Sequence, residues 1–190
     1  MQKIAVFASG SGTNAAAIAD YFSSHPHIEV ALVLSNNPDA GVLEKAKLRD
    51  IPTLIIDKGK LNSRELEQYL EDKEIDCIVL AGFLKLIPSN LLKKFHPKII
   101  NIHPALLPAY GGKGMYGMNV HRAVSDSGDT ETGITIHLVN EEYDKGQHLF
   151  QAKTRIEPGE DPNAIAGKVL KLEHHFFPRV IEHYLLEENQ

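Results

Sequence analysis

The feature that most constrains the fold is an alternation of short β-branched runs with longer amphipathic stretches. Runs such as Ile78-Val79-Leu80 are apolar at every position, which is typical of strands covered on both faces. Strands that alternate with helices predict a doubly wound, mostly parallel sheet, so the expected fold class is α/β. The expected strands cover residues 3–8, 29–34, 53–56, 77–80 and 99–103, and the expected helices cover residues 14–22, 41–49, 63–73 and 89–95.

Two helix starts carry their own signals. Asn62, followed three residues later by Glu65, is close to a capping box and predicts a helix after residue 62. Asp161 and Pro162 predict the N-cap and first position of a final helix that ends near Leu186.

The amino-acid composition changes at the start of the second half of the chain. A segment rich in Pro and Gly covers residues 104–117 and leads to a short helix near residues 119–125. Two runs, at residues 133–139 and 149–155, predict strands that extend the sheet. No repeat or linker divides the 190 residues, so we expect one domain.

Charge and cysteine content limit the partners and the compartment. The formal net charge is −5 and long basic runs are absent, which argues against binding of nucleic acid through clustered Lys and Arg. The apolar stretch after Lys3 is too short for a signal-peptide core, and no run is long enough to span a membrane. The single Cys77 cannot form an intrachain disulfide, so we expect a cytoplasmic protein. We expect a monomer or homodimer, and from its charge and apolar runs neither nucleic-acid nor membrane partners.

A glycine loop, Gly10-Ser11-Gly12-Thr13-Asn14, joins the first expected strand to the first helix. Its backbone N–H groups and the positive end of the helix suit a phosphate group. Ala15 completes the dinucleotide fingerprint, but that fingerprint needs an acidic residue about 20 positions further on, where the chain has Ser35-Asn36-Asn37. The loop therefore favours a single phosphate monoester over a dinucleotide, with a tight turn that binds nothing as the alternative.

Asn101 and His103 point to the same face at the end of the fifth expected strand. An amide and an imidazole side by side can bind and protonate a developing oxyanion if another group orients the imidazole. Nine other histidines occur, and spacing alone does not choose among them. None forms a His-x-x-x-His zinc pair with an adjacent Glu, so we predict no metal. By its local pattern alone, Asp144 is a turn aspartate.

Four segments together resemble the folate-dependent phosphoribosylglycinamide formyltransferase family of purine biosynthesis, over nearly the whole chain. They are residues 9–14, 79–87, 101–108 and 144–146. The motif Asn-x-His-Pro-x-Leu-Leu-Pro is the most specific part, and other enzymes that use 10-formyltetrahydrofolate share it in related form. The glycine loop points to the branch that acts on glycinamide ribonucleotide.

The resemblance implies transfer of a formyl group from N10 of the folate co-substrate to the glycinamide amine through a tetrahedral intermediate. Asn101 would hydrogen-bond the formyl oxygen, and His103 would stabilise the oxyanion and help to move protons. Asp144 would orient and charge the imidazole. We therefore expect this carboxylate to raise the pKa of His103 above its ordinary value of about 6.5.

The resemblance also implies two ligand sites within a single formyltransferase domain, residues 1–190. Residues 1–100 form the phosphate-binding half, and residues 101–190 form the catalytic and folate-binding half. The substrate-binding residues are Gly12, Thr13 and Asn14 for the phosphate and Glu173 for the amine. The folate-binding residues are Arg64, Leu84, Lys85, Leu86, Ile87, Asn101 and Asn140, with the loop up to Asp144. Without the family, residues 84–87 would be read as the end of a core strand.

One stretch departs from the commoner family pattern, because residues 110–121 form a longer connection with glycines at 111, 112, 114 and 117. We expect this loop to be mobile and Lys113 to be solvated rather than bound to a ligand. The main alternative function is a formyltetrahydrofolate hydrolase, a deformylase that uses similar Asn, His and Asp residues. An initiator-tRNA formyltransferase is disfavoured by length and charge, and a non-catalytic nucleotide-binding module leaves Asn101 and His103 unexplained.

Overall fold

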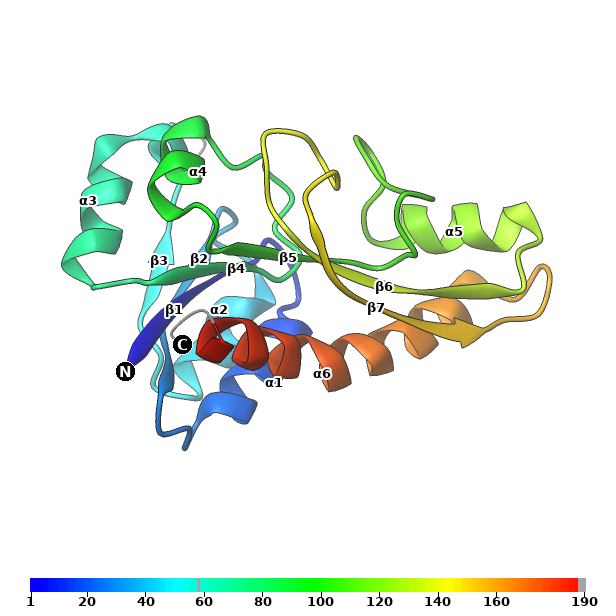
Figure 1. The fold of residues 1–190 in the computed structure, drawn as a ribbon, viewed down its shortest axis with the longest axis horizontal. Helices are drawn as coiled ribbons and strands as arrows, with labels where there is room; N and C mark the ends of the chain where they lie inside the picture. The colour runs from blue at the N-terminus through cyan, green and yellow to red at the C-terminus, as the bar shows by residue number, and fades with distance from the viewer. Residues whose placement is uncertain (58, 188–190) are drawn as a thin grey trace.

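The computed structural model describes residues 1–57 and 59–187, which form a seven-stranded sheet with helices on both faces (Figure 1). The strands are β1 (Gln2–Phe7), β2 (Ile28–Ser35), β3 (Thr53–Ile55), β4 (Cys77–Leu80), β5 (Ile99–His103), β6 (Glu131–Leu138) and β7 (His148–Arg155). The helices are α1 (Thr13–Phe22), α2 (Gly41–Lys47), α3 (Arg64–Asp72), α4 (Ser89–Phe95), α5 (Met118–Ser127) and α6 (Pro162–Glu187), with a 3-10 turn, η1 (Lys60–Asn62).

The strand order, β3-β2-β1-β4-β5-β6-β7, confirms the predicted α/β fold with a mostly parallel sheet. Strands β1 to β5 pair in parallel, whereas β6 pairs antiparallel with both β5 and β7. The chain moves outward from β1 to β3 and then returns to place β4 on the other side of β1. Ligands of such sheets bind outside the carboxyl ends of the strands at this reversal, which brings the loops after β1, β4 and β5 to one edge.

The core lies in two layers, one on each face of the sheet. In β1, Ile4 and Val6 belong to the buried cluster under α1 and α6, while Ala5 and Phe7 belong to the cluster under α3 and α4. All four are completely buried, and each larger side chain contributes about 1.5–3 kcal/mol through burial. The parallel strands are therefore apolar at every position because both of their faces are covered.

The two predicted helix starts have different outcomes. The prediction for α6 is confirmed, because Asp161 Oδ1 accepts hydrogen bonds from the backbone N–H groups of Asn163 and Ala164 at 2.9 and 3.2 Å. The cap predicted at Asn62 is wrong. The helix begins one residue later, and Ser63 Oγ accepts the hydrogen bond from the N–H of Leu66 at 3.2 Å.

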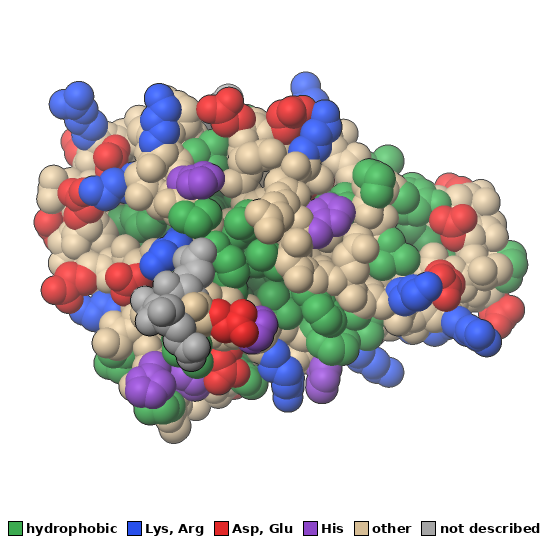
Figure 2. Space-filling model, viewed as in Figure 1, with side chains coloured by type: hydrophobic (Ala, Val, Ile, Leu, Met, Phe, Trp, Pro, Cys, Tyr) green, Lys and Arg blue, Asp and Glu red, His purple; other side chains and the backbone are tan. Residues whose placement is uncertain are grey.

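The second half of the chain adds strands to one edge of the sheet and packs a helix against it. The β6–β7 hairpin continues from β5, α6 crosses one face, and α5 lies beside the N-terminal part of α6 (Figure 1). No helix among residues 1–57 and 59–187 is long and apolar enough to cross a membrane. On the face drawn in Figure 2, acidic and basic side chains are interspersed rather than gathered into a patch of one sign.

Candidate active site

The carboxyl ends of β1, β4 and β5 open into one cavity of about 480 Å³. Its walls are the glycine loop after β1, the loop after β4, the end of β5, the segment 112–117 and the β6–β7 loop. A cavity of this size, with apolar walls and a few polar groups, is typical of a small-molecule site.

His103 and Asp144 meet inside this cavity although 41 positions separate them in the chain. His103 Nδ1 lies 3.6 Å from Asp144 Oδ1, and the imidazole Nε2 donates a hydrogen bond to the carbonyl of Tyr110 at 2.8 Å. Because a carbonyl only accepts, the ring carries its proton on Nε2, and in the neutral form Nδ1 is a free base beside the carboxylate.

The expectation that the pKa of His103 lies above its ordinary value is wrong, although Asp144 itself acts to raise it. Burial of the imidazole lowers its pKa, and the attraction of Asp144 and the Tyr110 carbonyl do not compensate. Only 3% of His103 is exposed, so the charged form loses most of its hydration. The resting imidazole is therefore neutral at pH 7 and able to accept a proton.

Asp144 is held by more than His103. Its Oδ2 accepts a hydrogen bond from the N–H of Gly112 at 2.9 Å, and its Oδ1 lies 3.7 Å from His137 Nε2. Burial acts to raise the pKa of Asp144, but His137, His103 and the Gly112 N–H together lower it. The carboxylate therefore stays ionised beside the imidazole.

His137 fixes the orientation of the Asn101 amide. Its Nδ1 donates to the carbonyl of Leu138 at 2.8 Å, and its Nε2 lies 3.0 Å from Asn101 Nδ2, within hydrogen-bond distance of the amide. This contact follows from the antiparallel register, which places Asn101 opposite His137. One amide hydrogen is thereby committed to His137, and the second is free for a ligand.

The glycine loop has the geometry of an anion site. Gly12 is the N-cap of the ten-residue α1 with φ +73°, and a Cβ there would lie 2.4 Å from Cβ of Val42. Only glycine fits this close approach. The loop is also fastened to its neighbours, because Ser9 Oγ donates to Asn36 Oδ1 at 2.6 Å and accepts from the N–H of Leu84 at 3.0 Å.

Asn14, at the start of α1, forms a hydrogen-bonded pair with Glu173 of α6. Its Nδ2 donates one hydrogen to Glu173 Oε2 at 2.8 Å and keeps a second one, so its phosphate contact stays a prediction. Burial raises the pKa of Glu173, and the hydrogen bond from Asn14 offsets this only in part.

Four large hydrophobic side chains that line the cavity are open to solvent. Leu84 and Leu86 are 48% and 44% exposed, and Tyr116 and Tyr143 are 50% and 41% exposed. Large apolar side chains are costly to leave in water, so their exposure in the cavity favours a ligand with an apolar part.

The chain matches the formyl transferase family model over residues 2–181. It belongs to the formyl transferase family. Among its relatives in this family, phosphoribosylglycinamide formyltransferase of Haemophilus influenzae is 37% identical over 188 residues, covering 96% of this chain and 86% of that protein. The chloroplastic enzyme of the same name from Arabidopsis thaliana is 43% identical over 187 residues, covering 95% of this chain but 64% of that protein. The chain therefore spans less than two thirds of its plant relative.

The fold of this formyl transferase chain also matches solved structures. Glycinamide ribonucleotide transformylase 1 from Geobacillus kaustophilus superposes with a TM-score of 0.88 at 36% identity, covering 97% of this chain and 99% of that one. Phosphoribosylglycinamide formyltransferase from Bacillus halodurans superposes with a TM-score of 0.87 at 34% identity, covering 100% of this chain and 97% of that one.

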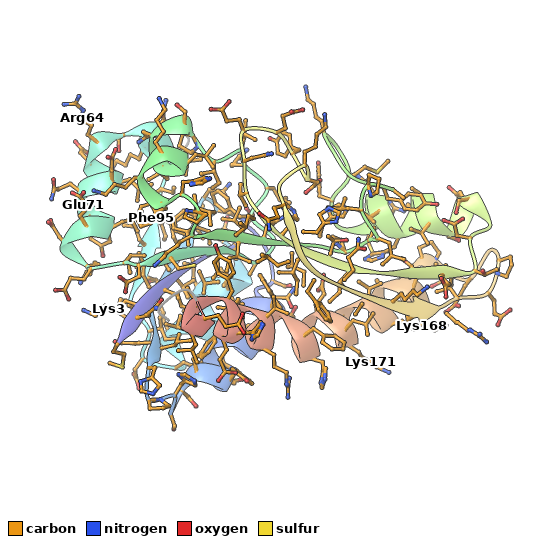
Figure 3. All side chains as sticks on the ribbon, in the orientation of Figure 1. Lys3, Arg64, Glu71, Phe95, Lys168 and Lys171 are labelled. Atoms are coloured by element: carbon orange, nitrogen blue, oxygen red, sulfur yellow. The ribbon has the colours of Figure 1, made fainter. Side chains whose placement is uncertain are left out.

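Most residues predicted for the site of this formyl transferase line the cavity, and one does not. The lining residues among them are Gly12, Thr13, Asn14, Leu84, Lys85, Leu86, Ile87, Asn101, His103, Asn140, Asp144 and Glu173. Lys113, expected to be solvated, is exposed and also lines the cavity. Arg64 is exposed on α3 and points away from the sheet (Figure 3), so its folate contact stays a prediction.

Sequence reasoning missed the roles of His137 and the Tyr110 carbonyl. His137 was one of ten histidines without a distinguishing pattern, and only the β5–β6 pairing places it against Asn101. Tyr110 acts through its backbone, which has φ +56°, so its side chain gives no sequence signal. Among the described residues, no three His, Cys, Asp or Glu side chains are placed to hold a metal ion.

Proposed function

We propose that the protein transfers the formyl group of 10-formyltetrahydrofolate to the amine of 5-phosphoribosylglycinamide, a step of purine biosynthesis. The observation that carries this proposal is the convergence of Asn101, His103 and Asp144 in a cavity shared by the glycine loop. Two relatives, at 37% and 43% identity, are named for the same reaction, which supports the proposal.

The proposed reaction moves one formyl group and one proton. The acceptor amine attacks the formyl carbon, a C–N bond forms, and the carbonyl electron pair moves to oxygen. The free hydrogen of Asn101 Nδ2 donates to this oxyanion. The neutral imidazole of His103 accepts the amine proton at Nδ1, where the ionised Asp144 stabilises the imidazolium. The proton then joins N10 as the bond between carbon and N10 breaks.

The two substrates use different walls of the cavity in this proposal. The phosphate of the acceptor binds the N–H groups at the start of α1, where the helix dipole favours an anion. Leu84, Leu86 and Ile87 form the flat apolar wall that suits the pterin ring. Local contacts in the site bind these small anionic substrates, so the net charge of −5 does not prevent their binding.

The test is to mix the protein with glycinamide ribonucleotide and 10-formyltetrahydrofolate and follow release of tetrahydrofolate. Formylated ribonucleotide should appear in equal amount, and release without the ribonucleotide should be slow. Equal release with and without the ribonucleotide would instead establish the deformylase, which uses water as the acceptor. We further propose a cytoplasmic location, which fractionation of cells that express the protein would test.

A further inference from the structure

His121 is a buried polar residue of the cavity without a hydrogen bond. It lies on α5, is 6% exposed and lines the cavity, and its ring bonds no other described residue. Its Nδ1 is wholly buried without a partner. Buried side-chain nitrogens are nearly always paired, so a cavity-lining imidazole with neither nitrogen bonded to the described protein points to a ligand. Because Nδ1 is wholly buried, Nε2 is the nitrogen left to meet that ligand.

The surroundings of the ring decide which nitrogen meets that ligand. A buried N–H without an acceptor is rarer than a buried lone pair without a donor, so the proton belongs on Nε2 rather than Nδ1. Burial lowers the pKa of His121, and the nearby His103 lowers it further, so the ring is neutral at pH 7. His121 therefore presents an uncharged N–H donor to the cavity.

The position of α5 indicates which substrate is within reach. Val120, beside His121, belongs to the same buried cluster as Val169 of α6, and the two helices are in contact. Glu173 follows Val169 by about one helical turn and also lines the cavity. His121 is therefore on the side of the cavity formed by α6, where the resemblance implies a contact between Glu173 and the acceptor amine. An uncharged donor suits an uncharged oxygen better than a phosphate.

We propose that His121 donates a hydrogen bond from Nε2 to an uncharged oxygen of the acceptor ribonucleotide, either a ribose hydroxyl or the glycinamide carbonyl. This inference rests on the proposed function and makes His121 a specificity residue for the acceptor. The folate donor does not use this contact.

Three substitutions separate this role from packing. His121→Leu removes both nitrogens, His121→Gln keeps a donor near the position of Nε2, and His121→Asn keeps one near the position of Nδ1. His183→Leu is the matched control, because that side chain is 70% exposed near the end of α6. Calorimetry with glycinamide ribonucleotide alone gives Kd, and steady-state assays give KM for each substrate.

We expect His121→Leu and His121→Asn to weaken ribonucleotide binding about tenfold, whereas His121→Gln stays within about threefold of the wild type. KM for 10-formyltetrahydrofolate should change less than about twofold in all three. Unchanged ribonucleotide affinity in His121→Leu overturns the proposal, as does a larger effect on the folate. Equal affinities of the Gln and Asn variants overturn the assignment to Nε2.

Thermal unfolding without ligand provides the readout for a merely structural role. We expect His121→Leu to melt at or above the wild-type temperature, since it no longer buries an unpaired nitrogen. A lower Tm with unchanged Kd would show that the ring only packs, and would overturn the proposal.

The wild type separates the two hypotheses: if it transfers formyl groups while His121→Leu binds normally, only the inference about His121 fails. A wild type that neither binds the ribonucleotide nor transfers formyl groups contradicts the proposed function itself.

Discussion

Nδ1 of His103 faces Oδ1 of Asp144 at 3.6 Å, with 4% of the imidazole and 12% of the carboxylate side chain exposed. This separation is longer than a hydrogen bond, as expected for a neutral ring whose proton sits on Nε2. Protonation of Nδ1 creates an ion pair between two side chains that are largely buried. The pair is thus arranged to hold a proton during the reaction rather than before it.

Replacement of Asp144 tests this arrangement. Asp144→Asn keeps the shape of the side chain but removes the charge that stabilises the imidazolium, so we expect kcat to fall about 10²- to 10⁴-fold. Affinity for the ribonucleotide should stay within about threefold, because the phosphate contacts lie in the glycine loop. Glu44→Gln, an exposed change on α2 outside the cavity, is the control. Normal turnover of Asp144→Asn would remove Asp144 from the mechanism.

His137 is expected to act on the reaction through Asn101. His137→Leu leaves the Asn101 amide without the acceptor that orients it, and we expect kcat to fall about 10- to 100-fold with KM nearly constant. His148→Leu provides a comparison, since His148 is exposed on the neighbouring strand and pairs with His137 in register. If both substitutions leave kcat unchanged, His137 does not position the amide.

The backbone at Gly12 sets a steric limit on the glycine loop. Gly12→Ala places a Cβ against Val42 in a left-handed conformation, and we expect a loss of about 2–5 kcal/mol in the free energy of unfolding. Gly10→Ala should have little effect on stability, because nothing lies within 4 Å of its Cβ position. Urea unfolding of both variants measures the difference. Similar stabilities would show that the loop can relax around the new methyl group.

The pH dependence of stability reports on buried histidines. Burial lowers the pKa of His103, His121 and His174, so near pH 6.5 the unfolded chain binds protons that the folded chain does not. Their contribution is fully present above about pH 6.5 and is lost as the pH falls towards the folded values. Glu173 acts in the opposite sense, because burial raises its pKa and the folded state binds its proton first. We therefore expect His121→Leu to lose less stability than the wild type between about pH 7.5 and pH 5.5. Urea unfolding at both pH values measures this loss, and equal losses in the two proteins would contradict a lowered pKa of His121.

The start of α3 offers a direct test of its cap. Ser63→Ala removes the side-chain acceptor for the N–H of Leu66, and we expect it to cost about 0.5–2 kcal/mol. Asn62→Ala should cost much less, since Asn62 lies outside the helix and makes no such contact. Chemical denaturation of the two variants distinguishes them. A larger cost for Asn62→Ala would restore the cap predicted from the sequence.

Local sequence patterns were sufficient to predict the helices and strands and the site residues that lie within them. Strand and helix ranges follow from periodicity and caps, because hydrophobic spacing and backbone hydrogen bonding act within a few residues of each other. Even so, Asn62 and Ser63 are both good caps, and only the backbone conformation at Ser63 chooses between them.

The sequence by itself determined the α/β class, the glycine loop at the start of α1 and the pairing of Asn101 with His103 on one face of β5. Each depends on contacts within one element or between neighbours in the chain. Only the tertiary structure decided that His137 contacts Asn101 and that Asn14 donates to Glu173. It also decided that burial outweighs Asp144, so that the pKa of His103 is lowered. The physical reason is that strand register, buried partners and hydration depend on segments far apart in the chain, whose packing no local pattern encodes.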